Sequence, residues 1–163
     1  MSWSGIGRTA AALFVLVGTA SPAAAQEGPT NRALIDTAAT ADVLERATSA
    51  SEELFTFTYT DLAGHKATFA TLTTGTLRSR YDDLFDTVVT QAITQKVSLT
   101  STVADAAVRM LRGDAAEVLV FLDQSSTRAD SGAQTQSKAM FLATLQRVDG
   151  DWRVADLNLF EDK

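Results

Sequence analysis

The only histidine of the chain, His65, lies four residues after Asp61. On a helix this spacing brings two side chains together, so the carboxylate can orient the imidazole for general acid–base chemistry. The alternative is an exposed turn with a solvated histidine, because Gly64 and the neighbouring residues are typical of a loop. Asp61 and His65 are the best catalytic candidates in the sequence, but we favour the exposed turn.

Two tyrosines could add a hydroxyl to such a site. A ketosteroid-isomerase-like reaction needs an Asp base opposite a Tyr or a protonated acid in an apolar cavity. Tyr59 and Tyr81 are the candidates, but Tyr81 also fits an apolar helical stripe, which is typical of a core residue. We assign neither tyrosine a catalytic role.

Three carboxylates, Asp82, Asp83 and Asp86, form an acidic group that could suggest a cation site. Arg78 lies four residues before Asp82, and Arg80 lies three before Asp83, which is the spacing of ion pairs on a helix surface. A calcium site needs about six or more oxygen ligands from a shaped loop. We therefore predict a solvated helix face here and no metal site.

Other catalytic and binding motifs are missing from the sequence. It contains no glycine-rich phosphate loop, no serine-nucleophile elbow and no HExxH zinc motif. The lack of cysteine removes disulfides, thiol catalysis and Cys-ligated zinc. The formal charge of −6, without a basic cluster, argues against nucleic acid as a partner. We predict no enzymatic activity and no cofactor.

The first 25 residues form a targeting segment. One arginine and no acid precede an apolar run over residues 10–19, and small residues end the segment at Ala23–Ala25. This order is the signal-peptide pattern, whereas the apolar stretch from Ile6 to Ala25 approaches the ~20 residues of a membrane span. We predict residues 1–25 to be a signal peptide or an N-terminal membrane anchor. In both cases the remainder is exported to the cell envelope, on the periplasmic side of the cytoplasmic membrane.

Residues 26–163 have the length and apolar content of a single domain. Apolar residues at spacings of four and three predict a long helix over about residues 30–57, with Thr30 or Asn31 as its cap, and a second helix over about residues 74–94. Residues 59–72, between them, contain only a short possible helical turn. The first stripe consists of Val43, Ala47, Ala50, Leu54 and Phe57, and the second of Leu77, Tyr81, Leu84, Phe85, Val88, Val89 and Ala92.

Residues from about 96 to 160 change to β character, with four runs rich in β-branched and apolar residues. Turn signals at Arg112–Asp114, Ala129–Gln136 and Asp149–Gly150 separate the runs. The segment TVADAAVRML also fits a helical stripe, and we assign it to a strand. Helices followed by antiparallel strands predict an α+β domain in which the helices cover one face of a curved sheet of about four strands.

Three segments occur in a characteristic order: YDDLFDTVV in the second helix, VLVFLDQSSTR in a strand, and LQRVDGDWRVADL near the C-terminus. Together with the N-terminal apolar segment and the long helix, they resemble the Mce-associated membrane proteins over about residues 31–159. These are accessory proteins of mammalian-cell-entry (Mce) lipid importers in actinobacterial envelopes. The most specific pieces are the L-x-R-V-D-G-x-W-x-V-x-D-L ending and the run Leu122–Thr127.

The resemblance implies a cone-shaped fold like that of nuclear transport factor two, no enzymatic activity, and a role in assembling or stabilising the import complex. The small residues at Ala23–Ala25 depart from the family pattern, in which the N-terminal segment stays as an anchor. In the closing hairpin, Trp152 is expected to pack in the core and not to contact a ligand.

Our first hypothesis is a non-enzymatic accessory protein that supports an Mce-type lipid or sterol import complex through contacts with other envelope proteins. The membrane is a further partner if the N-terminal segment stays uncleaved. The alternative is a periplasmic binder of, or a cone-fold enzyme acting on, a hydrophobic small molecule, with Asp61 and His65 as its acid–base pair. A curved sheet could leave a cavity for such a ligand, but we expect apolar side chains to fill the interior. The side chains concerned are Met110, Phe121, Met140, Phe141 and Phe160.

Overall fold

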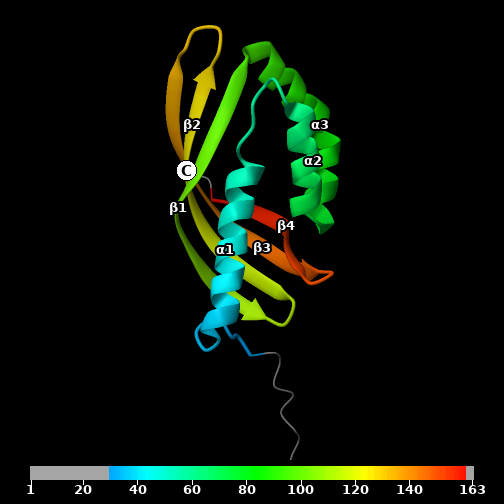
Figure 1. Cartoon of the computed structure of the whole chain (residues 1–163), viewed down its shortest axis with the longest axis vertical. Helices are drawn as coiled ribbons and strands as arrows, with labels where there is room; N and C mark the ends of the chain where they lie inside the picture. Colours follow the sequence, from blue (N-terminus) through cyan, green and yellow to red (C-terminus); the bar gives the residue numbers. More distant parts are fainter. Residues whose placement is uncertain (1–29, 161–163) are drawn as a thin grey trace, which may run out of the picture.

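The computed structural model describes residues 30–160, so the targeting segment predicted at residues 1–25 lies outside the described residues. Three helices precede four strands in this part of the chain (Figure 1). The helices are α1 (Thr37–Leu54), α2 (Leu62–Leu72) and α3 (Gly75–Gln95). The strands are β1 (Val97–Arg112), β2 (Ala115–Arg128), β3 (Gln134–Val148) and β4 (Asp151–Leu159). The predicted α+β class is confirmed, and TVADAAVRML lies in β1.

The strands form one antiparallel sheet in the order β1-β2-β3-β4. In the last hairpin, Asp149 and Gly150 both have positive φ, 54° and 90°, as the two central residues of a type I′ turn require. The register shifts after Val103 and Val108 in β1, and after Thr144 in β3. Such bulges bend strands and increase their twist, which gives the sheet its curvature.

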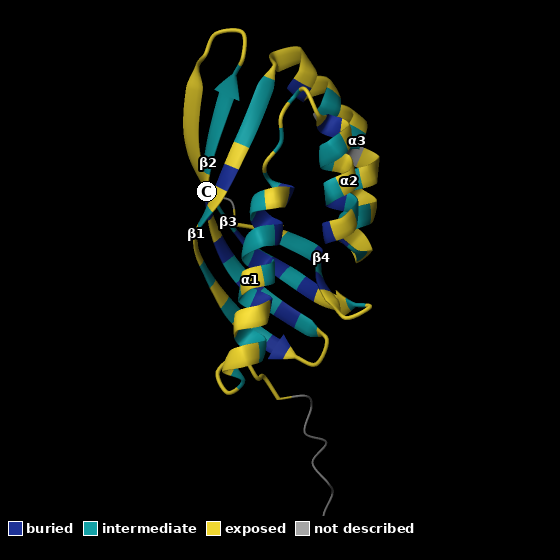
Figure 2. Ribbon diagram, in the orientation of Figure 1, coloured by how far each residue is buried: buried dark blue, intermediate teal, exposed yellow. Residues whose placement is uncertain are grey.

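The core lies between the helices and one face of the sheet, and buried residues alternate with more exposed ones along the strands (Figure 2). In β2, Val118, Val120 and Leu122 are at most 1% exposed, whereas the intervening Phe121 is 38% exposed. This period of two is the pattern of a sheet covered on one face only.

Helix α1 packs on the sheet through small side chains. Val43, Ala47 and Ala50 are at most 1% exposed, as their predicted stripe requires. Small residues let the helix backbone approach the strands closely. Phe57 belongs to the predicted stripe but lies beyond the end of α1, where it forms a β-bridge with Leu99.

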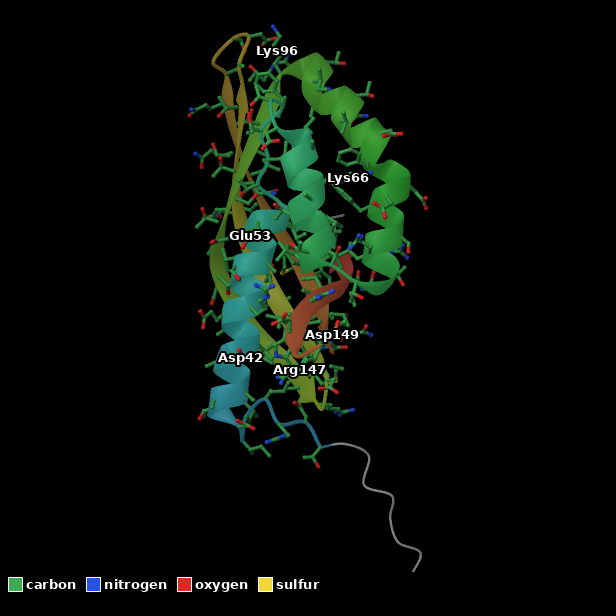
Figure 3. All side chains as sticks on the ribbon, turned by 45° about the vertical axis from the view of Figure 1, so that its right-hand side comes forward. Asp42, Glu53, Lys66, Lys96, Arg147 and Asp149 are labelled. Atoms are coloured by element: carbon green, nitrogen blue, oxygen red, sulfur yellow. The ribbon has the colours of Figure 1, made fainter. Side chains whose placement is uncertain are left out.

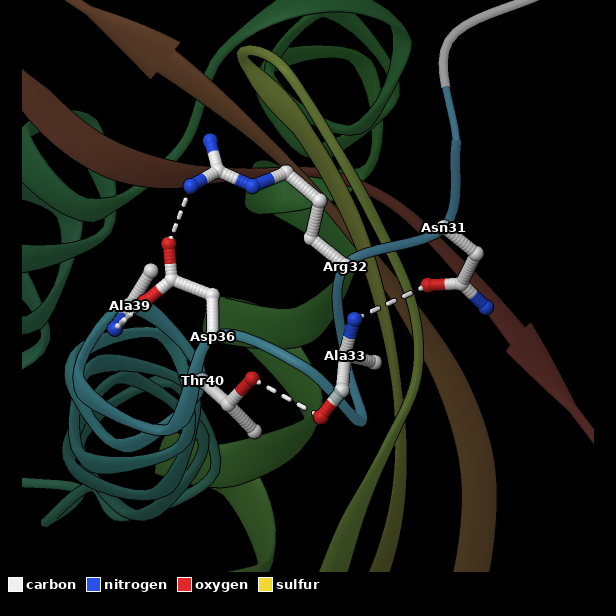
Figure 4. Close-up of polar contacts among 6 residues, drawn as sticks. All are labelled: Asn31, Arg32, Ala33, Asp36, Ala39 and Thr40. Carbon is white, nitrogen blue, oxygen red and sulfur yellow. Dashed lines mark hydrogen bonds and ion pairs between the residues drawn. The ribbon is translucent and has the colours of Figure 1, made fainter.

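Helix α1 begins at Thr37, seven residues after the predicted start at about residue 30. Asp36 is its N-cap, and the Asp36 carboxylate accepts a hydrogen bond from the Ala39 amide at 3.0 Å (Figure 4). Asn31 does not cap a helix. Its side-chain oxygen instead accepts a hydrogen bond from the amide of Leu111 in β1 at 2.9 Å. The segment before α1 is therefore held by the sheet.

Helix α2 has eleven residues, where the sequence indicates only a short helical turn. It is followed directly by α3, which matches the second predicted helix within one residue at each end. Lys96 ends α3 in the left-handed conformation, with φ of 48°. Figure 1 shows α2 and α3 side by side, next to β4.

The outer edge of β1 is covered by groups from outside the sheet. Four of its amides donate hydrogen bonds to the segment before α1 or to the end of α1 and its following loop. The pairs are Leu99 N to Phe57 O, Ser101 N to Thr56 Oγ1, Val103 N to Glu52 Oε1 and Leu111 N to Asn31 Oδ1, at 2.9–3.0 Å. A strand edge whose donors are satisfied in this way is protected against pairing with other chains.

Candidate functional site

Asp61 is the N-cap of α2. Its carboxylate accepts a hydrogen bond from the Gly64 amide at 3.0 Å. A Cβ atom at position 64 would lie 2.4 Å from Asp61 Oδ2, so glycine leaves the room that this cap needs. Asp61 and His65 share only the backbone bond from His65 N to Asp61 O, at 3.3 Å. The structure therefore uses this carboxylate to begin a helix, and the alternative in which Asp61 orients the His65 imidazole does not occur.

The cap gives a first expected result: Asp61→Ala lowers the free energy of unfolding by about 1 kcal/mol, because a helix-start amide loses its acceptor. Asp61→Ser keeps a capping oxygen and is expected to retain most of the stability. Urea unfolding followed by circular dichroism measures both variants. Equal losses for Ala and Ser would contradict the capping role.

His65 lies on α2, half-buried among aromatic rings. Its ring centroid is 5.7 Å from that of Phe57, 6.4 Å from that of Phe69 and 6.0 Å from that of Tyr81. Burial lowers the pKa of His65 from its ordinary 6.5, and a hydrogen bond with the Thr56 backbone offsets part of this effect. The expected exposed turn with a solvated histidine is wrong. The imidazole is a packing group that the fold keeps neutral.

This burial makes the stability depend on pH. In the unfolded chain His65 takes up a proton at its ordinary pKa of 6.5, whereas the folded protein resists protonation until lower pH. The contribution of His65 is therefore fully present above pH 6.5 and is lost as the pH falls below it. We expect His65→Phe to remove this part of the pH dependence, measured by urea unfolding between about pH 5 and pH 8. Identical pH profiles of the two proteins would contradict the burial of the ring.

Tyr81 and Phe69 join α3 to α2. Their rings stack with centroids 3.6 Å apart and planes at 10°. The Tyr81 hydroxyl is buried without a hydrogen-bond partner among the described residues. Burial, and next the charge of Asp82, raise the pKa of Tyr81 to about 12. Tyr81 thus belongs to the packed stripe, as its spacing predicts. The Lys66 ammonium, on α2, lies 4.3 Å from the centroid of the Phe85 ring on α3; Figure 3 labels Lys66.

Asp61 and His65 border a groove of about 790 Å³ between the end of α1, the start of α2 and β1. The groove also contains Glu52 and Glu53. Glu52 already accepts the Val103 amide at 2.9 Å. The groove holds no acid–base pair, because its one histidine has no carboxylate as a hydrogen-bond partner among the described side chains.

Of the acidic group on α3, Asp82 forms an ion pair with an arginine of the same helix. Arg78 and Asp82 are 3.9 Å apart, as their spacing of four predicts. Arg80 pairs with Asp156 of β4 at 3.5 Å and not with Asp83, because α3 lies against β4. Within residues 30–160, no group of three or more acidic or histidine side chains is placed to hold a metal ion.

A second groove, of about 840 Å³, lies on the sheet where β4 ends. Phe121, Met140 and Phe160 line it, and Phe121 and Phe160 are 38% and 48% exposed. We expected these three side chains, together with Met110 and Phe141, to fill the interior. Of the five, Phe141 alone is fully buried. The others lie on the face that no helix covers, because neighbouring strand residues point to opposite faces. Met110 is half-buried on β1.

Comparison with protein families and curated proteins identifies relatives but no family. No family model matches the chain. It is 40% identical over 81 residues to two uncharacterized proteins of Mycobacterium tuberculosis, Rv1362c and, from a second strain, MT1407. The match covers 49% of this chain, and it spans 37% of the length of these relatives. Within residues 30–160, no helix is both long enough and apolar enough to cross a membrane.

Three solved structures share the fold at low sequence identity. A periplasmic fragment of TraM aligns with a TM-score of 0.62 and 12% identity, over 76% of this chain and 98% of the fragment. CagV of Helicobacter pylori, a VirB8 homolog of a type IV secretion system, aligns at 0.62 and 12%, over 76% of this chain and 99% of CagV. An IcmL-like type IV secretion system protein of Legionella pneumophila aligns at 0.63 and 10%, over 83% of this chain and 96% of that protein. At these identities the likeness shows a common fold, an α+β domain with a four-stranded antiparallel sheet.

Proposed function

We propose that this chain is a non-enzymatic, extracytoplasmic accessory protein that supports the assembly or stability of an Mce-type lipid or sterol import complex. In this proposal it acts through contacts with other envelope proteins, and its sheet and helices form a cone like that of nuclear transport factor two. The resemblance of YDDLFDTVV, VLVFLDQSSTR and LQRVDGDWRVADL to Mce-associated proteins supports the link to lipid import.

The fold supports a role outside the cytoplasm. It is shared with a domain described as a periplasmic fragment and with two proteins described as belonging to type IV secretion systems. The signal-peptide pattern at residues 1–25 is an independent observation in the same direction.

The observation that carries the proposal is the apolar surface on the uncovered face of the sheet. Phe121 and Phe160 are 38% and 48% exposed and border one groove together with Met140. Clustered exposed apolar side chains on a soluble domain are typical of a surface that binds another protein. The catalytic alternative has no comparable support, because Asp61 caps α2 and His65 packs among aromatic rings.

The test is a pull-down of the full chain with a C-terminal tag from native membranes solubilised in mild detergent. Mass spectrometry identifies both the co-purified proteins and the N-terminus of the tagged chain. We expect Mce-type subunits to co-purify. A tagged chain that begins at Gln26 and carries no partner would overturn the proposal and favour a free ligand-binding domain.

A second measurement separates the accessory role from the enzymatic alternative. Asp61→Ala and His65→Ala variants are expected to leave transporter-dependent lipid uptake unchanged when their protein levels match those of the parent chain. Loss of uptake at normal protein levels would count against the non-enzymatic role.

A further inference from the structure

Strand β3 extends beyond its neighbour β4. The pairing between them runs from Val148 opposite Asp151 to Phe141 opposite Leu159. It closes with a hydrogen bond from Phe160 N to Met140 O at 3.0 Å. The remaining residues, Gln134–Ala139, pair with β2 on one side. On the other side they pair with no strand in the described part of the chain.

The register shows which backbone groups are open. Met140 O points toward β4, and strand residues alternate in the direction of their N–H and C=O groups. No register shift occurs in the β2–β3 pairing. The N–H and C=O groups of Gln134, Gln136 and Lys138 therefore point to the open side. These groups form a template for one more antiparallel or parallel strand.

Little in the sequence blocks this edge. The segment Gln134–Lys138 contains no proline, and all five of its residues are exposed. Its single charge, on Lys138, is engaged by Asp123 of β2 at 2.7 Å. The opposite edge of the sheet differs, because amides of β1 such as Ser101 and Val103 donate to groups outside the sheet. Among the described residues, the end of β3 is thus a strand edge that is open to a partner.

The apolar groove lies at the same place. It is lined by Phe121, Met140 and Phe160, and also by Lys138 and Asp105. A strand that continues the line of β4 beside Lys138 would place alternate side chains next to this groove, since diagonal neighbours on adjacent strands lie about 7–8 Å apart. Asp105 lies farther away, on β1 opposite Phe121, and its carboxylate accepts a hydrogen bond from the Ala106 amide at 2.9 Å.

We propose that the edge Gln134–Lys138 binds an extended segment of another protein as an added strand. This segment is basic and carries an aromatic or branched apolar side chain that fills the groove beside Met140. The inference rests on the proposed role in protein contacts and names the mode of binding. Main-chain hydrogen bonds supply the affinity, and the groove supplies the specificity.

A second copy of the chain fits this surface less well. Pairing two such edges would bring together two molecules with a formal charge of −6 each. It would also place the polar residues Gln134–Lys138 of one copy against those of the other, which brings no apolar side chain to Phe121 and Phe160. Charge complementarity therefore favours a basic partner segment.

The test uses the full chain in mild detergent and a fluorescein-labelled probe peptide, Lys-Thr-Phe-Thr-Val-Thr-Lys. Its lysine, phenylalanine and valine side chains lie on one face of a strand and its threonines on the other. We expect a rise in fluorescence anisotropy on binding. We also expect slower amide hydrogen exchange, measured by mass spectrometry, in fragments that contain residues 134–139.

Two pairs of variants locate the bound strand. Gln136→Pro removes one outward N–H and leaves the bonds to β2 in place, because proline is tolerated where its nitrogen faces the open side of an edge strand. We expect it to weaken probe binding about 10-fold, the worth of roughly one hydrogen bond, while Gln136→Thr binds like the parent. Phe121→Glu is expected to abolish binding. Its control is Ile93→Glu. Ile93 is 52% exposed and lies on α3, which does not line the groove.

Several outcomes would overturn the inference. Binding that is equal for Gln136→Pro and Gln136→Thr would exclude strand addition, and so would protection confined to other segments. Protection of residues 134–139 that depends on protein concentration without peptide, together with a dimer in sedimentation, would assign the edge to a second copy. If Gln136→Pro and Phe121→Glu still co-purify with the envelope partners of the parent chain, the inference fails and the proposed function stands.

Discussion

Replacing Trp152 by alanine is expected to lower the free energy of unfolding by about 3–5 kcal/mol, the range for truncating a large aromatic in a core. Trp152 is the second residue of β4, just after the Asp149–Gly150 turn, and is 3% exposed. Alanine would leave a cavity between α1 and the hairpin that joins β3 to β4. Such cavities are costly because the surrounding core relaxes only in part.

Polar contacts add to the packing of Trp152. Its indole Nε1 donates a hydrogen bond to Asp42 Oδ2 at 3.1 Å, and its carbonyl accepts one from Arg46 Nε at 3.1 Å. The Arg147 guanidinium lies 4.6 Å from the ring and 3.7 Å from the Asp42 carboxylate. Figure 3 shows Asp42 and Arg147 on facing elements near the turn. The side chain therefore ties α1 to the last hairpin.

Urea unfolding followed by far-ultraviolet circular dichroism measures this loss, since Trp152 itself would contribute to any fluorescence signal. Trp152→Phe keeps most of the apolar area but loses the indole donor, and it is expected to cost clearly less than the alanine variant. Asp42→Ala removes the indole acceptor and the exposed ion pair with Arg147 but leaves the ring in place, and it is expected to cost about 1 kcal/mol. A loss below about 1 kcal/mol for Trp152→Ala would contradict its place in the core.

The strands could be predicted because their signals are local. Alternating apolar residues, bounded by Asp-Gly and Arg-Gly-Asp turns, specify a hairpin from within about ten residues of chain. The observed turn at Asp149–Gly150 has positive φ at both positions, as such a pair predicts. The packing role expected for Trp152 follows from the same hairpin.

The start of α1 and the whole of α2 depend on contacts that periodicity does not contain. Asn31 has the residue type of a helix cap, but it binds the Leu111 amide, 80 positions away in the sequence. Helix α2 is short and has Gly64 in its first turn, which weakens a helical pattern. In the structure this glycine has a role, because the absence of a side chain leaves room for the Asp61 carboxylate that caps α2.

The candidate site also depends on contacts between residues that are distant in the sequence, which spacing alone does not predict. The spacing of Asp61 and His65 is compatible with a helix, but we favoured an exposed turn, and the structure has the helix α2 there. However, Asp61 stands at the helix start, where its carboxylate turns to an amide, while His65 meets Phe57 and Tyr81 from other elements. The groove near Phe121 requires the register of β3 and the end of β4. The sequence did not predict this groove, because we expected Phe121, Met140 and Phe160 to fill the interior.

Phe141→Ala is expected to lower the free energy of unfolding by about 3–5 kcal/mol, whereas Met140→Ala is expected to cost about 1 kcal/mol. Phe141 is fully buried, lies opposite Val120 of β2, and has its ring 5.2 Å from that of Phe55. Met140 is its neighbour in β3 and points to the other face, where it is half-buried beside the groove. Urea unfolding of the two variants makes the comparison at adjacent positions of one strand.

Equal losses for the two variants would contradict the view that only one face of the sheet is covered. The same pair also separates stability from recognition. Met140→Ala is expected to weaken binding of the probe peptide while the protein stays folded, because it removes part of the groove wall. Phe141→Ala acts on the opposite face, so below its own unfolding transition it is expected to leave the edge Gln134–Lys138 able to bind. A peptide affinity that depended on Phe141 and not on Met140 would place the bound segment on the helical side of the sheet.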